Sequence, residues 1–194
     1  MRRALIVVDV QPTFCEGGSL PVPGGNACAE RIADFVEANR TQYCLVISTQ
    51  DWHIDPGDHF SPTPDFIDTW PPHGQAGSAE AELHPALVNL NADIAIRKGH
   101  YSAAYSGFEG NDDEGRSLTD VLQDGGITHV DIVGLAQSHC VAQTALDGVS
   151  QGLSVRVFED LTEPVSEELG IAAAKVMDEA GVKLCSSRDV FSSH

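Results

Sequence analysis

Short apolar runs rich in Val, Ile and Leu recur along this chain, and they constrain its fold more than any other feature. Six of these runs are expected to form buried strands, at 4–8, 44–49, 94–96, 130–133, 155–158 and 182–185. Helix-like segments lie between several of them, at 26–39, 118–124, 139–150 and 166–180. Because strands that alternate with helices form parallel sheets covered on both faces, the sequence predicts a three-layer α/β/α protein.

One long segment interrupts the alternation. Residues 51–81 are rich in Pro, Gly, His and Asp and show no periodicity. A loop of that length inside a compact domain is usually functional. Since no repeat or linker is recognisable in the 194 residues, we expect a single domain over 1–194 with a metal-binding loop insertion at about 51–81.

The charge balance argues against two classes of partner. The chain has 29 acidic against 11 basic residues and a formal charge of -18, so it repels phosphates and anionic lipids. We therefore expect neither nucleic acid nor a membrane as partner, and the crowded carboxylates suggest adaptation to salt. Asp9 interrupts the apolar N-terminal run, and no stretch approaches the ~18 apolar residues of a membrane span. A cytoplasmic protein is expected.

The five cysteines are odd in number and scattered without a CxxC pair, which argues against a disulfide framework or a Cys-rich zinc site. Cys140 differs from the others because it stands where a predicted strand gives way to a helix. Backbone amides at a helix N-terminus favour a thiolate, and those of Ala136 and Cys140 would suit a developing oxyanion. Ordinary core or surface thiols are expected at Cys15, Cys28, Cys44 and Cys185.

Reactive side chains also follow the other predicted strands. Asp9 follows the first strand, Asp51 the second and Lys98 the third. Open parallel sheets bind ligands at the carboxyl ends of their strands, so these groups should converge there with Cys140. An ammonium group lowers the pKa of a nearby thiol, and a carboxylate can accept its proton and return it to a leaving amine. Lys98 and Asp9 are available for those roles.

A second cluster lies in the long loop. Asp51 and His53 are two residues apart and can face one cation, while His59 and His73 follow within the same loop. Such a set suits one divalent ion per chain, Zn, Fe(II) or Mn(II), and leaves positions open for water or substrate. Surface or structural roles are expected for the remaining histidines, His84, His100, His129, His139 and His194.

Five strings occur in a distinctive order and spacing: IVVDVQPTFCEGGSL, STQDWHIDPGDHFS, DTWPPHGQAGS, RKGHYSAAYSGFEG and VGLAQSHCVAQTALD. Together they resemble the nicotinamidase/pyrazinamidase family of the isochorismatase-like cysteine hydrolases, over about residues 3–186. The resemblance implies a six-stranded parallel sheet and a nicotinamidase that forms nicotinate and ammonia through a thioester on Cys140. Pyrazinamide is an expected further substrate, NAD salvage the expected pathway, and a monomer or small homo-oligomer the expected state.

The resemblance also implies roles for individual residues. The family's base, cation and nucleophile match Asp9, Lys98 and Cys140, its metal ligands match Asp51, His53 and His73, and the extra histidine of actinobacterial-type members matches His59. Phe14 and Trp70 match aromatic walls that sandwich the pyridine ring, and Tyr105 matches a residue near the pocket mouth. The bond between Ala136 and Gln137 matches a cis peptide that turns amides toward the oxyanion.

Three pairs of residues depart from the family pattern. The family usually has Asn-Asp, Cys-Val and Thr-Asp where this chain has Pro12-Thr13, Gly74-Gln75 and Gln137-Ser138. None of them is a predicted triad residue or metal ligand. They leave the turn geometry and the fine substrate preference open.

Three other functions remain open at this stage. A related amidohydrolase acting on a carbamoyl or ureido substrate would generally lack the metal cluster. A two-His-one-carboxylate Fe(II) oxygenase would use Asp51, His53 and His73 but leave Cys140 and Lys98 idle. A redox-sensing thiol on a binding protein would use Cys140 alone. Metal content, O₂ dependence and amide turnover separate these from a nicotinamidase.

Overall fold

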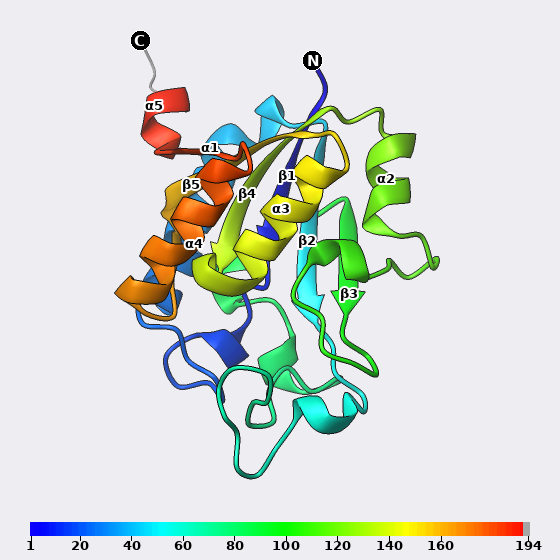
Figure 1. The fold of residues 1–194 in the computed structure, drawn as a ribbon. Coiled ribbons are helices and arrows are strands. Elements are labelled where there is room, and N and C mark those ends of the chain that lie inside the picture. The colour runs from blue at the N-terminus through cyan, green and yellow to red at the C-terminus, as the bar shows by residue number, and fades with distance from the viewer. Residues whose placement is uncertain (192–194) are drawn as a thin grey trace.

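The computed structural model describes residues 1–191, and within them six parallel strands form one sheet in the order β3-β2-β1-β4-β5-β6 (Figure 1). The strands are β1 (Arg3–Val8), β2 (Leu45–Asp51), β3 (Ile94–Lys98), β4 (His129–Leu135), β5 (Ser154–Glu163) and β6 (Lys183–Cys185). Every neighbouring pair is parallel. The predicted parallel sheet is therefore confirmed, and each of its strands includes most or all of a predicted run.

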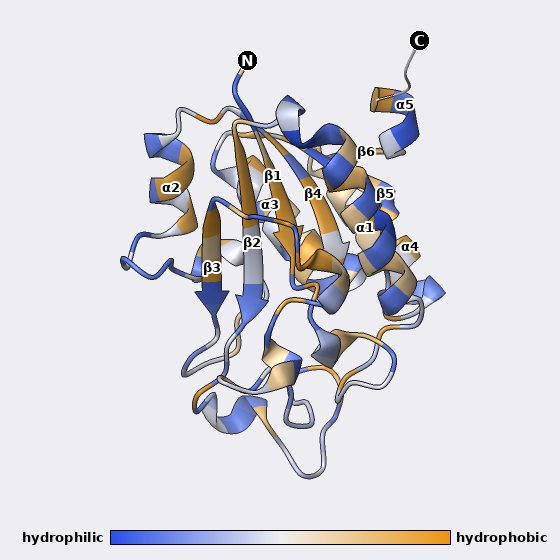
Figure 2. Cartoon of the chain, turned by 180° about the vertical axis from the view of Figure 1, so that it is seen from behind, coloured by the Kyte–Doolittle hydropathy of each residue, from blue (hydrophilic) through white to orange (hydrophobic). Residues whose placement is uncertain are grey.

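Helices cover both faces of the sheet. They are α1 (Gly25–Asn39), α2 (Leu118–Asp124), α3 (Ala142–Ser150), α4 (Glu167–Glu179) and α5 (Ser187–Phe191). Figure 1 shows α3 and α4 in front of the strands, whereas Figure 2, seen from behind, shows α1 across the opposite face. This is the three-layer α/β/α arrangement expected from the sequence.

The two layers of core follow from the alternation of side chains along each strand. In β1, Leu5 and Val7 pack on the face that α1 covers, beside Ile32. Ala4, Ile6 and Val8 instead pack on the face covered by α2, α3 and α4. All five strand residues are completely buried, which explains why the strand reads as a continuous apolar run.

Two elements differ from the expectation. The helix expected from residue 139 begins as a π-helical turn, Gln137–Val141, and becomes α-helical only at Ala142. The short helix α5 was not predicted, because its five residues contain too little pattern. Its Phe191 packs on the rings of Phe35 and Phe158, with centroids 5.6 and 6.0 Å away.

The strand order reverses between β1 and β4, which are hydrogen-bonded neighbours although two strands separate them in sequence. In α/β sheets the crevice at such a reversal is the usual ligand site. The loop at 51–81 lies beyond this carboxyl edge in Figure 1. It contains the 3₁₀ turn Gly57–His59 and two isolated bridges, His53 to Gln75 and Phe60 to Trp70.

Two further findings concern the described residues. The five cysteines are all free thiols there. Among residues 1–191 no helix has both the length and the apolar composition needed to cross a membrane.

Candidate active site and metal centre

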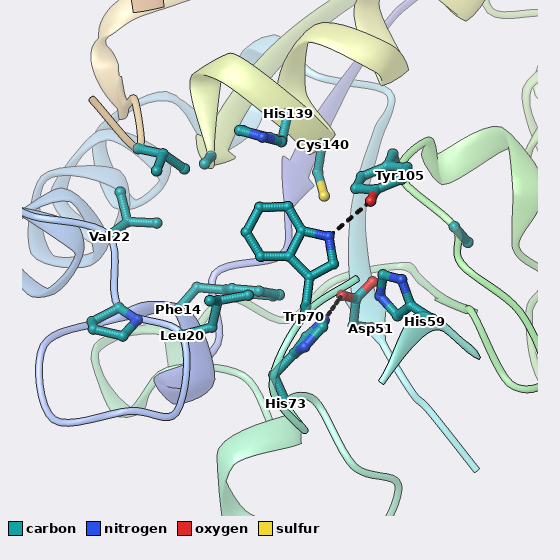
Figure 3. Close-up of a pocket in the computed structure, with 14 residues that line it drawn as sticks. Phe14, Leu20, Val22, Asp51, His59, Trp70, His73, Tyr105, His139 and Cys140 are labelled. Atoms are coloured by element: carbon teal, nitrogen blue, oxygen red, sulfur yellow. Dashed lines mark hydrogen bonds and ion pairs between the residues drawn. The ribbon is translucent and has the colours of Figure 1, made fainter. Parts of the chain in front are cut away.

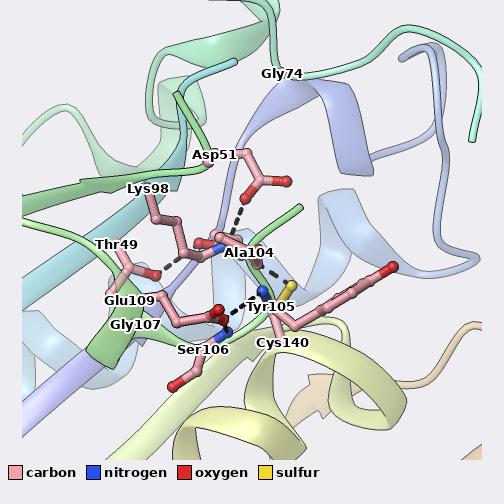
Figure 4. Close-up of polar contacts among 12 residues, drawn as sticks. Thr49, Asp51, Gly74, Lys98, Ala104, Tyr105, Ser106, Gly107, Glu109 and Cys140 are labelled. Carbon is pink, nitrogen blue, oxygen red and sulfur yellow. Dashed lines mark hydrogen bonds and ion pairs between the residues drawn. The ribbon is translucent and has the colours of Figure 1, made fainter. Parts of the chain in front are cut away.

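The structure brings Asp9, Lys98 and Cys140 together at the carboxyl edge of the sheet, as predicted. Figure 4 shows Lys98 and Cys140 of this cluster. Lys98 Nζ lies 2.8 Å from Asp9 Oδ2 and 3.9 Å from Cys140 Sγ. Asp9 directly follows β1 in a left-handed conformation with φ 49°, Lys98 ends β3, and Cys140 sits in the π-helical turn after β4. All three side chains are buried, so these charges interact with little screening by water.

Lys98 is the centre of this cluster. Besides Asp9, its ammonium group contacts Asp51 Oδ1 and donates to the backbone oxygen of Ala104 at 3.0 Å. Burial lowers the pKa of Lys98, but the carboxylates of Asp51 and Asp9 outweigh burial and raise the pKa well above its ordinary value. Lys98 is therefore a fixed positive charge inside the protein.

The pKa values of Asp9 and Cys140 are both raised above their ordinary values. Burial raises the pKa of Asp9 against the opposing effect of Lys98, and Thr49 Oγ1 donates to Asp9 Oδ1 at 2.6 Å. Burial likewise raises the pKa of the Cys140 thiol well above its usual value. Lys98 acts in the predicted direction, but burial outweighs it. The resting site therefore holds Cys140 as a thiol beside the Asp9 carboxylate, which is paired with Lys98 and can accept the thiol proton.

Hydrogen bonds from α3 fix the turn that carries Cys140. Thr144 Oγ1 donates to the Cys140 carbonyl at 2.7 Å and accepts from Gly107 N at 3.0 Å. The amides of His139 and Val141 both donate to the Ala136 carbonyl, at 3.0 and 3.1 Å. π-Helical turns of this kind are frequent at functional sites.

The position of the cis peptide was predicted one residue too late. The cis bond joins Leu135 to Ala136, not Ala136 to Gln137. It stands directly after the last residue of β4, at the point where the strand ends. Ala136 and Cys140 nevertheless both line the same pocket.

The predicted metal ligands also converge. Potential ligand atoms of His53, His59 and His73 lie within 4.8 Å of one another, and all three residues are buried. Asp51 Oδ2 faces the same point, 3.4 Å from His53 Nε2 and 3.6 Å from His73 Nε2. Asp51 thus stands between the two clusters, with one oxygen on Lys98 and the other toward the histidines.

The chemistry of these residues fits a divalent metal ion. His53 Nδ1 is bound to Gly99 O at 2.5 Å and His73 Nδ1 to Pro71 O at 2.8 Å, so each Nε2 is the nitrogen that faces the cluster. Within the described residues, His53 Nε2 and His59 Nδ1 are buried without a hydrogen-bond partner. Burial, with smaller effects of His73 and His53, lowers the pKa of His59 to about 4, which leaves a free lone pair at neutral pH.

An apolar pocket joins the two clusters (Figure 3). The three residues predicted to contact substrate, Phe14, Trp70 and Tyr105, all line it. Trp70 Nε1 donates to Tyr105 Oη at 3.0 Å, which links the long loop to the segment after β3. Residues lining the pocket that the sequence reasoning missed are Leu20, Pro21, Val22, Ala104, His139 and Val165. An aromatic wall between a thiol and a metal centre suits a small planar ligand.

A surface or structural role was expected for His139, and the structure places this residue in the pocket lining. Its ring lines the pocket at right angles to Trp70, with the centroids 5.8 Å apart. The available signal was its position next to Cys140. Of the other histidines in that group, His84, His100 and His129 lie outside the pocket lining and the metal cluster, and His194 lies outside the described residues.

Gln11 is a positioning residue that the sequence reasoning also missed. Its side-chain amide pairs with the backbone of Asp51 in both directions, each bond measuring 3.0 Å. It also donates to Ala81 O at 2.8 Å, at the other end of the long loop. Gln11 therefore fixes the backbone that carries the shared carboxylate, and only its place two residues after Asp9 hinted at this.

Comparison with known proteins places this site in a family. A family model described as an isochorismatase domain matches residues 3–189. Over 186 residues the chain is 50% identical to a protein named nicotinamidase/pyrazinamidase from Mycobacterium tuberculosis, covering 95% of this chain and 100% of that one.

Two solved structures share the fold over almost their whole length. The pyrazinamidase of Pyrococcus horikoshii, in complex with zinc, has a TM-score of 0.80 and 31% identity, covering 96% of this chain and 99% of that one. PnC1 from L. infantum, in complex with nicotinate, has a TM-score of 0.82 and 35% identity, covering 96% and 93%.

Proposed function

The chain belongs to the isochorismatase family, and from this premise we propose that it is a metal-containing cysteine amidohydrolase that converts nicotinamide to nicotinate and ammonia. One observation carries the proposal: a buried Asp9, Lys98 and Cys140 cluster shares an apolar pocket with three converging histidines. The similar proteins named nicotinamidase/pyrazinamidase and pyrazinamidase, and the neighbour in complex with nicotinate, support this substrate class. Pyrazinamide is proposed as a second substrate.

The first half of the reaction starts from the Cys140 thiol and from the Asp9 carboxylate that is paired with Lys98. Asp9 accepts the proton of the Cys140 thiol, and the sulfur attacks the carboxamide carbon. Lys98, 3.9 Å from the sulfur, stabilises the thiolate as it forms. The backbone amides of Ala136 and Cys140, in the turn beside the sulfur, take the developing oxyanion.

The second half releases the two products. Asp9 returns its proton to the leaving nitrogen, so that ammonia departs and a thioester on Cys140 remains. A water molecule, deprotonated by Asp9, then attacks the thioester carbonyl, and nicotinate leaves as the thiol is restored. The raised pKa of Asp9 makes its carboxylate a better proton acceptor than an ordinary aspartate.

The pocket walls and the metal centre are proposed to orient the substrate. Phe14 and Trp70 are proposed to enclose the pyridine ring, with Tyr105 at the mouth. Asp51, His53, His59 and His73 would hold one divalent ion, Zn, Fe(II) or Mn(II). When bound, this ion would act as a Lewis acid toward the ring nitrogen of the substrate and would thereby orient the amide.

The remaining expectations from the sequence stay predictions. They are a single domain over residues 1–194, a cytoplasmic location, a role in NAD salvage, and a monomer or small homo-oligomer without nucleic-acid or membrane partners.

The decisive experiment is ammonia release from nicotinamide by the purified protein, with total metal measured on the same sample. We expect turnover with about one metal ion per chain, and no turnover in Cys140→Ala. Absence of turnover from a metal-loaded sample would overturn the proposal. Turnover that survives in Cys140→Ala would overturn the thioester route.

A further inference from the structure

The turn that carries Cys140 contains two residues that depart from the family pattern, Gln137 and Ser138, and each has a defined partner. Gln137 Nε2 donates to the backbone oxygen of Gly170 in α4 at 3.1 Å. Ser138 Oγ accepts a hydrogen bond from the backbone amide of Val165 at 3.1 Å and lies 2.9 Å from His139 Nδ1. Ser138 therefore connects the segment after β5 to a ring in the pocket wall.

The chemistry of these atoms limits where the hydrogens can lie. The Val165 amide can only donate, so it occupies one lone pair of Ser138 Oγ. The Ser138 hydroxyl has one hydrogen, which it can donate to His139 Nδ1, 2.9 Å away; the opposite arrangement, with Nδ1–H donating to the second lone pair of Oγ, is the other tautomer. An imidazole that accepts at Nδ1 and is neutral carries its own hydrogen on Nε2.

The surroundings of His139 keep its ring neutral. Burial lowers the pKa of His139, and no nearby charge contributes to this shift. The titratable groups that face the ring in the pocket are Tyr105, whose centroid is 6.5 Å away, and Cys140. Burial raises the pKa of both these groups, so both are uncharged at neutral pH.

His139 is well placed to meet a ligand. Its ring lines the pocket next to Cys140 and stands perpendicular to Trp70, as Figure 3 shows. Nδ1 is engaged by Ser138, which leaves Nε2 as the ring nitrogen able to contact a bound molecule. A neutral ring with its hydrogen on Nε2 offers a donor there.

We propose that Ser138 is a positioning residue that holds His139 as an Nε2–H hydrogen-bond donor on the pocket wall, where it binds an acceptor atom of the substrate and of the carboxylate product. This proposal deepens the proposed nicotinamidase function and rests on it. Ser138 determines which ring nitrogen of His139 carries the hydrogen, and it thereby favours ligands that present an acceptor beside the thiol.

The tautomer is measured directly by ¹⁵N NMR of the imidazole nitrogens in the metal-loaded protein, with the His139 signals assigned by their loss in His139→Gln. We expect a pyridine-like Nδ1 and a protonated Nε2, and a shift of the Nε2–H signal on titration with nicotinate. A protonated Nδ1 in the unmodified protein would overturn the proposal, as would an Nε2–H signal that nicotinate leaves unchanged while it saturates the pocket.

Variants at position 138 separate positioning from simple packing. Ser138→Ala should abolish the tautomer preference and raise KM for nicotinamide about three- to tenfold, the effect of one hydrogen bond, with kcat changed less than about twofold. Ser138→Thr, which keeps the hydroxyl, should restore both. Ser150→Ala is the matched control, because Ser150 is exposed and, among residues 1–191, its hydroxyl bonds only Asp147 O, at 2.8 Å.

The outcomes of this series are distinct from those of the turnover assay. An unchanged tautomer in Ser138→Ala, or a failure of Ser138→Thr to restore it, would overturn the positioning role even if nicotinamide is hydrolysed at the normal rate. The expected tautomer in a protein that does not hydrolyse nicotinamide would instead count against the proposed function.

Discussion

Strand β4 has a buried charged cluster near each end, and the two clusters are built in opposite ways. Near its amino end, Asp131 receives hydrogen bonds from Arg3, Arg156 and Tyr43, at 2.6–2.8 Å. Beyond its carboxyl end, Asp9 Oδ2 has the Lys98 ammonium 2.8 Å away but no well-directed hydrogen bond. His53 Nε2 and His59 Nδ1 likewise lack partners among the described residues.

The difference teaches which buried charges serve the fold and which serve chemistry. A carboxylate with all its oxygens paired is costly to disturb and has nothing left to offer a ligand. Unpaired buried atoms are tolerated where a ligand, an ion or a reacting group will complete them. The Asp131 cluster should therefore control stability, and the Asp9 cluster should control activity.

The largest expected effect is the loss of turnover in Cys140→Ala. Removing the nucleophile should lower kcat for nicotinamide at least ~10⁴-fold, in line with nucleophile deletions in other hydrolases. The sulfur makes no contact that the fold depends on beyond its packing, so the urea midpoint and the metal content should change little. A stability loss as large as the one expected for Asp131 would break the comparison.

Asp131→Asn should have the opposite effect, which is a loss of stability without a loss of kcat. It leaves two guanidinium groups, only 15% and 17% exposed, facing a neutral amide, and should lower the free energy of unfolding by about 3 kcal/mol or more. The folded fraction should keep its kcat. Glu179→Gln is the control: its contact with Lys175 is exposed and 3.9 Å long, so urea denaturation should show a change below about 0.5 kcal/mol.

His53→Ala tests the metal half of the site. The buried Nε2 is one of the atoms that converge on the metal centre. Its loss should reduce the amount of bound metal at least tenfold, and the KM for nicotinamide should rise in the same variant. Metal analysis after gel filtration provides the measurement. A normal metal content in this variant would remove His53 from the ligand set, and His129→Ala, outside the cluster, should retain its metal.

Acid should lower the free energy of unfolding of the metal-free protein over a defined pH range. The pKa of His59 is lowered to about 4, mainly by burial, whereas in the unfolded chain it stays near the ordinary 6.5. Between these values the unfolded state binds more protons, so the free energy of unfolding should fall as the pH drops from about 6.5 toward 4. Urea titrations of the metal-free protein across this range should show a smaller slope in His59→Gln.

The smallest effect concerns the whole surface. With a formal charge of -18, repulsion among carboxylates should weaken the fold at low ionic strength. Screening in molar salt should raise the melting temperature by about 2–4 °C, the shift that ~1 kcal/mol produces in a chain of this size. A melting temperature that does not rise with salt would argue against salt adaptation.

The sequence predicted the sheet well because each strand is buried on both faces and therefore stands out as an apolar run. It also placed Asp9, Lys98 and Cys140 together, because the ends of parallel strands meet at one edge. Residue burial was harder to foresee. The expected depression of the thiol pKa failed because burial outweighs the Lys98 charge, and only the packed structure shows how much water is excluded.

Contacts between loops were beyond the reach of sequence patterns. Thr13 and Gly74, two of the departures from the family pattern, turn out to contact each other, since Gly74 N donates to Thr13 Oγ1 at 3.1 Å. Nothing in the spacing of 61 residues predicts that pairing. The place of His139 in the pocket could not be predicted for a similar reason, because it depends on where the long loop puts Trp70.

The reversal of strand order between β1 and β4 has a consequence for the nascent chain during its synthesis. Asp9 and Lys98 both belong to the β1-β2-β3 half of the sheet, which leaves the ribosome first, whereas Cys140 arrives only when β4 pairs with β1. The base and the cation can thus be in place before the sulfur is delivered between them. An emerging chain carries no activated thiol, and the enzyme becomes reactive only when the second half of its sheet has docked.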